Sequence, residues 1–179
     1  MKSFSPSFSS SSLFIIFFCL ICYASVPALC VSLYETVCNE ARQDANACLN
    51  LLKTDSKITS ATNYHDLSKS IVVFAFNQGL QAQAYLLKVA KQFPSDEAVS
   101  QCANEFYIMS IRYFGNAMID VDKDPQNAKN DVKTGGDGPA NCEKAIQNDK
   151  RVHDPAIHAK NNEMVLLSEI SFLAINHLT

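Results

Sequence analysis

The sequence has no tryptophan and only five glycines in 179 residues, and no stretch alternates apolar and polar residues as a strand would. It also lacks the motifs of common catalytic sites. There is no HExxH zinc pair, no GxSxG nucleophile turn, and no CxxC pair among the cysteines that follow residue 30. The formal net charge is −3 without a basic run, which argues against a nucleic-acid partner. These absences favour a protein that is not an enzyme and that works by binding.

The first thirty residues are typical of a secretory signal peptide. A short basic start and a serine-rich stretch precede an apolar core, residues 13–23, which is short for a membrane span. Small residues follow, and cleavage after Ala28 or after Cys30 fits them equally well. We therefore predict a signal peptide over residues 1–30 and one mature domain over residues 31–179. A retained N-terminal anchor is the alternative.

Seven cysteines are present, and three of them lie in the predicted signal peptide. Cleavage after Cys30 leaves four, an even number in a protein bound for an oxidising compartment, so two disulfides are expected. Four cysteines allow three pairings. Proximity in the sequence favours Cys38–Cys48 and Cys102–Cys142, although composition alone leaves the other pairings open.

One long stretch, residues 63–93, has the helical pattern around which the chain is organised. Its apolar residues recur at steps of three and four, with Gln78 as the one polar member, and a helix of this length spans roughly 45 Å. A single helix with one apolar stripe is not stable alone in water, so other long helices must cover it. The expected stripe consists of Leu67, Ile71, Phe74, Ala82, Tyr85, Val89 and Phe93.

The flanking segments supply such helices. Residues 33–52 predict a small helical hairpin, and residues 53–62 a polar linker. A second long helix is expected from Ser95 or Asp96, either of which can cap it, to about Asp122. Its expected core stripe consists of Val99, Cys102, Phe106, Met109, Tyr113 and Ala117.

The third long segment begins at Asp124 and Pro125 and contains an unusual stretch, residues 134–139 (TGGDGP). Three glycines and a proline make a continuous helix costly, so we expect a break and a restart with Pro139 in the first turn. A last helix is expected over residues 156–178. The predicted fold is all-α: an up-down-up-down four-helix bundle with an N-terminal helical hairpin and two disulfides.

The aspartates at 120, 122 and 124 resemble the first ligands of an EF-hand loop. Pro125 then occupies the position that needs glycine, and Asp131 stands where a bidentate glutamate belongs, so a solvated acidic turn is the better interpretation. The glycines of residues 134–139 lack the lysine and the preceding strand of a phosphate loop. We predict no metal and no cofactor.

Two further interpretations come from residue types alone. A Cys–His nucleophile is compatible with the composition, but an even set of extracellular cysteines is usually bridged. Long apolar stripes can line a lipid or ligand tunnel, which would make the protein a carrier. More often such stripes form the core.

The chain resembles the plant invertase and pectin methylesterase inhibitors over residues 33–178. The resemblance rests on the signal peptide, on cysteines ten and forty residues apart, on the order of the long helices, and on the final helix, EMVLLSEISFLAINHL. It implies disulfides in sequence order, Cys38–Cys48 closing the hairpin and Cys102–Cys142 tying the second bundle helix to the third. It also implies a protein secreted to the cell wall or the vacuole, which covers the active cleft of a carbohydrate enzyme in a one-to-one complex.

The resemblance also suggests which enzyme is the target. Invertase inhibitors of this family insert a Pro-Lys-Phe motif into the substrate pocket, and the matching residues here are Pro125, Gln126 and Asn127. Proline is kept, whereas the cation and the aromatic are missing. Pectin methylesterase inhibitors use a broader face of the bundle. The resemblance therefore favours pectin methylesterase as the partner, with acid invertase as the alternative and no membrane contact after cleavage.

Overall fold

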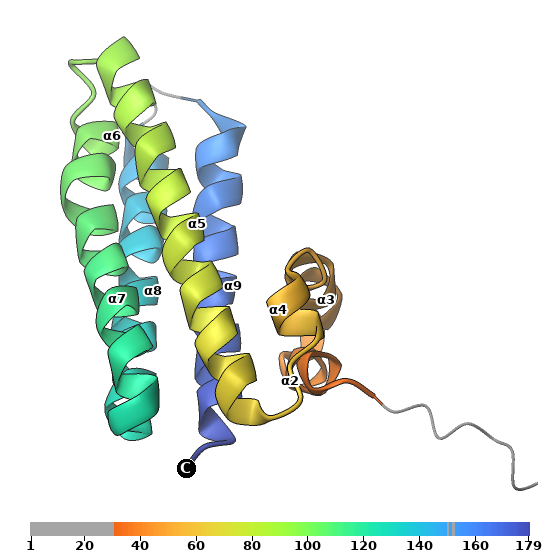
Figure 1. Ribbon diagram of the computed structural model, residues 1–179. Coiled ribbons are helices and arrows are strands. Elements are labelled where there is room, and N and C mark those ends of the chain that lie inside the picture. Colours follow the sequence, from red (N-terminus) through yellow and green to blue (C-terminus); the bar gives the residue numbers. More distant parts are fainter. Residues whose placement is uncertain (1–30, 150, 152) are drawn as a thin grey trace, which may run out of the picture. The chain divides into compact units, whose positions relative to one another are not determined.

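The computed structural model describes residues 31–149, 151 and 153–179, so the predicted signal peptide and its cleavage position lie outside the described residues. Within those ranges every regular element is a helix (Figure 1). None of the described helices is long and apolar enough to cross a membrane.

The N-terminal hairpin has the predicted form. Helix α2 (Leu33–Glu40) and helix α3 (Ala45–Leu52) flank a single 3₁₀ turn, and a disulfide joins Cys38 to Cys48. The polar-linker prediction for residues 53–62 is wrong in part, since it contains a short helix, α4 (Ser56–Thr59). The Asp55 carboxylate accepts bonds from two backbone N–H groups of α4, and Ile58 is buried, which together stabilise this turn.

Four long helical segments form the bundle, which confirms the predicted fold. They are α5 (Tyr64–Gln92), a composite helix made of α6 (Glu97–Gln101), a π-helical turn (Cys102–Phe106) and α7 (Tyr107–Lys123), then α8 (Pro125–Asn148) and α9 (Pro155–Asn176). Helix α5 packs against α7 and α9, and α8 packs against the same two helices (Figure 1). Because α5 touches two neighbours, it buries two adjacent rows of side chains. The predicted burial of Phe93 is wrong. This residue follows the last residue of α5, and its side chain is 46% exposed.

Each long segment begins at an Asn or Asp whose side chain accepts a bond from the first turn. Only Asp96 was among the caps predicted from the sequence, as one of two candidates. The acceptors are Asn63 before α5, Asp96 before α6, Asp124 before α8 and Asp154 before α9. Proline occupies the first turn of α8 and of α9, where its missing N–H leaves no bond unmade.

The residues predicted to be buried between Phe106 and Tyr113 are wrong by one position, whereas Ala117 is buried as predicted. The π-helical turn Cys102–Phe106 inserts one extra residue, so the buried positions shift from Phe106, Met109 and Tyr113 to the residue that follows each. Met109 is therefore 39% exposed. The residues that are buried instead are Tyr107, Ser110 and Phe114.

The break predicted at residues 134–139 is also wrong, because α8 is continuous through Pro139. Proline has no N–H, so the carbonyl of Gly135, four residues earlier, loses its helical partner. The buried hydroxyl of Ser110 on α7 donates to that carbonyl at 2.6 Å. A contact from the neighbouring helix thus replaces the missing bond, and the glycines allow that helix to come close.

We expect Ser110→Ala to lower the free energy of unfolding by about 1–3 kcal/mol, because the Gly135 carbonyl is then buried without a donor. The same change should cost less in a Pro139→Ala background, since the N–H restored at position 139 can bond Gly135 within the helix. Urea unfolding of the four variants measures this difference. Equal costs in both backgrounds would show that the hydroxyl does not compensate for the proline.

Candidate functional site

The predicted target contact, Pro125 to Asn127, forms the first turn of α8 at the end of the bundle. Gln126 and Asn127 are both exposed, so they are available to a partner. The backbone N–H of Asn127 donates to Asp124 at 3.0 Å, and its side-chain amide donates to Asp120 at the end of α7. The turn is thus held in one conformation by the acids around it.

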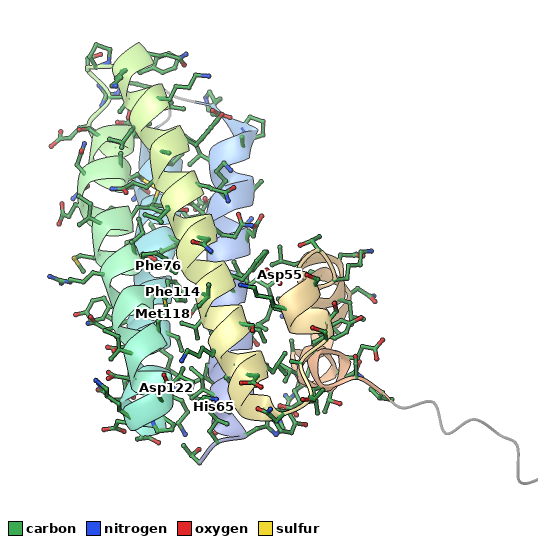
Figure 2. All side chains as sticks on the ribbon, in the orientation of Figure 1. Asp55, His65, Phe76, Phe114, Met118 and Asp122 are labelled. Atoms are coloured by element: carbon green, nitrogen blue, oxygen red, sulfur yellow. A yellow bond between two sulfur atoms is a disulfide. The ribbon has the colours of Figure 1, made fainter. Side chains whose placement is uncertain are left out.

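The three aspartates once compared with an EF-hand have separate partners. Asp124 caps α8, Asp120 accepts from Asn127, and Asp122 pairs with Lys69 and His65 on α5. The hydrogen bond from Lys69 holds the pKa of the Asp122 carboxyl below its usual range, against the effect of desolvation. Figure 2 shows His65 and Asp122 at the same end of their two helices. Within the described residues no group of three His, Cys, Asp or Glu side chains is placed to hold a metal ion.

Asp131, one turn further along α8, is the exception among these acids. Its Oδ2 atom is buried without a hydrogen-bond partner. Burial raises the pKa of this carboxyl, and the charge and hydrogen bond of Asp120 raise it further. Asp120 and Asp131 thus place two acids of like charge on neighbouring helices beside the candidate contact turn.

We expect Asp131→Asn to stabilise the protein at neutral pH by up to about 1 kcal/mol, because it removes a charge that folding disfavours. A carboxyl whose pKa is raised by folding weakens the native state above that pKa and has no effect once it is protonated in both states. The gain should therefore shrink as the pH falls through the range where Asp131 takes up its proton. Thermal unfolding at several pH values measures it, and Asp137→Asn, an exposed change on the same helix, serves as the control. A gain that is constant with pH would contradict this interpretation.

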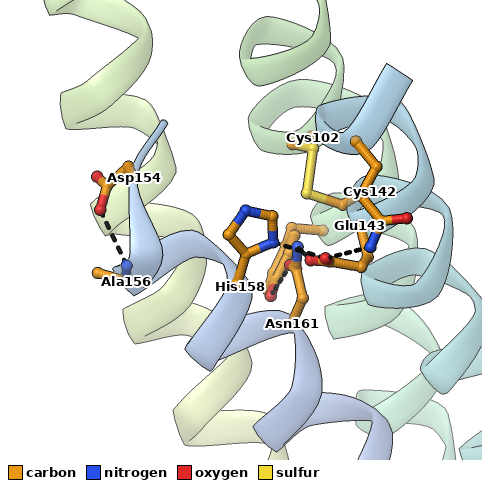
Figure 3. A network of polar contacts seen from close by, with 9 residues as sticks. Cys102, Cys142, Glu143, Asp154, Ala156, His158 and Asn161 are labelled. Atoms are coloured by element: carbon orange, nitrogen blue, oxygen red, sulfur yellow. Dashed lines mark hydrogen bonds and ion pairs between the residues drawn. A yellow bond between two sulfur atoms is a disulfide. The ribbon is translucent and has the colours of Figure 1, made fainter. Parts of the chain in front are cut away.

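A second polar cluster lies at the opposite end of α8, beside the Cys102–Cys142 disulfide (Figure 3). The Glu143 carboxylate contacts His158 Nδ1 at 2.6 Å and accepts from Asn161 at 2.9 Å, and Asn161 in turn accepts from the Tyr107 hydroxyl. Desolvation pushes the pKa of Glu143 up, but the bonds from Asn161, His158 and Gln147 outweigh it and lower the pKa. Sequence reasoning missed this cluster, because no motif links residues so far apart.

A carboxylate–histidine pair invites a catalytic interpretation. The Cys–His nucleophile considered above is excluded, since all four cysteines that follow residue 30 are bonded in pairs, Cys38 to Cys48 and Cys102 to Cys142. The bonds of the Glu143 cluster instead run between α8, α9 and the start of α7. They tie three helices together at this end of the bundle.

The apolar stripes expected either to form a core or to line a tunnel meet in one continuous core of buried side chains. The best-defined hollows on the described part are open surface grooves. One of about 710 Å³ runs between α3 and α9 and is lined by a mixture that includes Asp44, Asn50, Glu163 and Val165. The groove is open to solvent, and acids and amides interrupt its apolar residues, whereas a ligand pocket buries most of the surface of its ligand.

The side chains that sequence reasoning missed most clearly are exposed and half-buried apolar residues along the seam between α5 and α7. Phe76 lies over Gly115, with its ring 3.5 Å from where a β-carbon on that glycine would be, so the two helices meet closely there. Apolar residues continue from this contact at helical spacing on both helices. We call this set the α5/α7 stripe: Val73, Phe76, Leu80 and Leu87 on α5, and Ile108, Ile111, Gly115 and Ile119 on α7.

The stripe is unusual in its exposure. Ile119 is 55% exposed, Ile108 50%, Leu80 42% and Leu87 37%. It ends at the Lys69–Asp122 ion pair, next to the contact turn of α8. The isoleucines lie outside the row expected on α7 from the sequence, so they were not singled out there.

No protein-family model matches the chain, and no curated protein matches it either. Solved structures do. One is a mutant form of a pectin methylesterase inhibitor from Arabidopsis, with a TM-score of 0.71, 19% identity, and coverage of 81% of this chain and 96% of that one. Another is a pectin methylesterase inhibitor from Arabidopsis thaliana, with a TM-score of 0.61, 19% identity, and coverage of 82% and 95%. The chain therefore has the fold of these inhibitors.

Proposed function

We propose that this chain is a secreted inhibitor that binds a plant pectin methylesterase and blocks its active cleft in a one-to-one complex. The observation that carries the proposal is the likeness to the Arabidopsis inhibitor structures, which extends over 96% and 95% of their chains. The exposed turn of α8 and the α5/α7 stripe supply surfaces for such a partner. Acid invertase is the second candidate, because Pro125 occupies the place of the family's invertase-contact motif.

The direct test is inhibition. Purified residues 31–179 are titrated into a plant pectin methylesterase, with methyl-ester hydrolysis as the readout, and into an acid invertase, with sucrose cleavage as the readout. We expect saturable inhibition of the first enzyme at one chain per enzyme. If neither enzyme is inhibited, and neither is retained on the immobilised chain, the proposed function is wrong and a non-inhibitory secreted protein is the better interpretation.

The contact turn separates the two targets. Changing Gln126→Lys together with Asn127→Phe restores the cation and the aromatic of the invertase motif at two exposed positions. Such an anchor is worth about 2 kcal/mol, near thirtyfold in affinity. We expect invertase inhibition to tighten by this factor and pectin methylesterase inhibition to change little.

The control for this pair is Asn127→Ala, which removes the bond to Asp120 without adding an anchor. If the native chain inhibits invertase strongly and the double change leaves that inhibition as it was, these positions do not enter the invertase pocket.

A further inference from the structure

Two lysines one turn apart on α8, Lys129 and Lys133, lie beside the aromatic ring of Phe172 on α9. Their Nζ atoms are 5.9 Å and 4.1 Å from the centre of that ring. In the part of the chain that the structure describes, no carboxylate lies within 4.0 Å of either ammonium. Because like charges four residues apart on a helix repel each other, this pair favours an anion beside it.

Lys129 is unusual in its burial, since only 8% of its surface is exposed. Its ammonium donates to the Thr179 hydroxyl at 3.0 Å and to the side-chain oxygen of Asn176 at 3.4 Å. Both acceptors are neutral, so they orient the ammonium without compensating its charge. Buried charges in proteins are usually paired with an opposite charge. A bound anion would supply that opposite charge here.

The groove next to these lysines changes from positive to negative along its length. It lies between α8 and α9, has a volume of about 410 Å³, and is lined by Lys133, Phe172, Asp137 and Glu169 among others. Asp137 follows Lys133 by one turn of α8, and Lys129 precedes it by one turn, so the two signs of charge lie at opposite ends. An open groove of this kind contacts a short stretch of a polymer and leaves the rest of it in water.

We propose that this groove binds a sugar acid, namely a uronate unit of an acidic polysaccharide. The carboxylate of the sugar accepts charge-assisted hydrogen bonds from Lys129 and Lys133. The apolar face of the sugar ring packs on Phe172 once the Lys133 ammonium turns from the ring to the carboxylate. Hydroxyl groups at the other end of the sugar donate to Asp137 and Glu169. A simple anion such as phosphate uses the lysines alone and is repelled by the two acids.

This site goes beyond the proposed inhibition, since the binding of a sugar acid does not depend on any enzyme. Only its connection with pectin rests on the proposed function. Hydrolysis of a methyl ester on pectin releases methanol and leaves a carboxylate. The enzyme would thus turn neutral units, which cannot pair with the lysines, into charged units that can. An inhibitor with this site would gather where de-esterified pectin accumulates.

The test uses an oligomer of galacturonic acid as the probe, titrated into purified residues 31–179 at fixed ionic strength. The fully methyl-esterified oligomer and inorganic phosphate are titrated in parallel. We expect saturable binding of the acid, and binding about tenfold weaker for the ester and for phosphate. Lys133→Gln removes an exposed charge from the groove and should weaken binding of the acid by a similar factor. Lys144→Gln, which removes an exposed charge elsewhere on α8, should leave it within about twofold.

Each outcome has a separate meaning. Equal binding of the acid and its methyl ester, or an equal effect of Lys133→Gln and Lys144→Gln, overturns the site. Phosphate that binds as tightly as the sugar acid reduces it to a simple anion site and overturns the sugar assignment. A chain that inhibits pectin methylesterase but does not bind the sugar acid loses this site and keeps the proposed function. A chain that binds the sugar acid but inhibits no enzyme keeps the site and loses its connection with pectin methylesterase.

Discussion

Removing the Cys102–Cys142 disulfide by changing both cysteines to alanine is expected to lower the free energy of unfolding by about 4 kcal/mol. Removing Cys38–Cys48 in the same way should cost nearer 2.7 kcal/mol, roughly two thirds as much. The difference follows from loop length, since the first bond closes a loop of 40 residues and the second a loop of 10. Opening a longer loop releases more conformational entropy in the unfolded chain, so it destabilises the native state more.

The two disulfides form a well-matched pair for this comparison. All four cysteines are fully buried, so each double change leaves a similar small cavity and loses similar contacts. Urea unfolding of the native chain and the two double variants gives the ordering. Equal costs, or a larger cost for the hairpin bond, would show that native-state contacts rather than loop closure decide the contribution of these disulfides.

The longer disulfide also acts at a particular place. It joins the first residue of the π-helical turn to α8, beside the Glu143 cluster (Figure 3). The carbonyl of Ala103 in that turn accepts a bond from Gln83 on α5 at 3.0 Å. Side chains from two neighbouring helices thus hold the irregular turn, and the register of the whole of α7 depends on it.

Local signals account for the parts of the fold that could be predicted from the sequence. Asn63, Asp96 and Asp124 are caps that act within one turn, and they mark the helix starts correctly. The number and order of the helices follow from these caps and from the apolar spacing. The same holds for the hairpin, where a polar turn separates two short apolar helices.

The predictions that were wrong depend on contacts between helices. Nothing local in the stretch from Cys102 to Phe106 distinguishes a π-helical turn from a regular one, so the next three buried residues were each predicted one position too early. The predicted break in α8 rested on the free-energy cost that glycines and Pro139 have in an isolated helix. That cost is offset by the Ser110 hydroxyl, which lies 25 residues away in the chain.

The surfaces of the candidate site also differ in whether adjacent residues or contacts between helices define them. The candidate contact turn at Pro125 was predicted from a family resemblance carried by adjacent residues, and it stays a prediction. The α5/α7 stripe depends on which faces of α5 and α7 meet, which the contact of Phe76 with Gly115 shows and the sequence does not. Surfaces that arise from the packing of two helices are visible only once both registers are known.

The glycines of α8 lead to the second large effect. Gly138→Ala is expected to lower the free energy of unfolding by about 3 kcal/mol, at the upper end of overpacking costs. A β-carbon at this position would lie 2.4 Å from the carbonyl oxygen of Phe106 and 3.1 Å from Cβ of Ser110. The first contact is with backbone, which cannot rotate away, so α7 and α8 would have to separate.

Gly115→Ala is the matched control, because it makes the same chemical change on the other helix of this pair. There a β-carbon would lie 3.5 Å from the Phe76 ring, an ordinary van der Waals distance. Replacing glycine by alanine inside a helix stabilises it by up to about 1 kcal/mol when nothing is in the way. The two substitutions should therefore change stability in opposite directions, which thermal or urea unfolding shows directly.

The two large effects should also depend on each other. The Cys102–Cys142 bond holds the backbones of the π-helical turn and α8 together, with Cα atoms 4.9 Å apart, close to where Gly138 meets Phe106. While the disulfide is intact the helices have little room to separate, so Gly138→Ala lowers the free energy of unfolding by its full amount. In the variant without this disulfide the helices can move apart, and Gly138→Ala should cost less, with a coupling of about 1 kcal/mol in a double-mutant cycle. Additive costs would mean that the clash is relieved by a movement that the disulfide does not restrain.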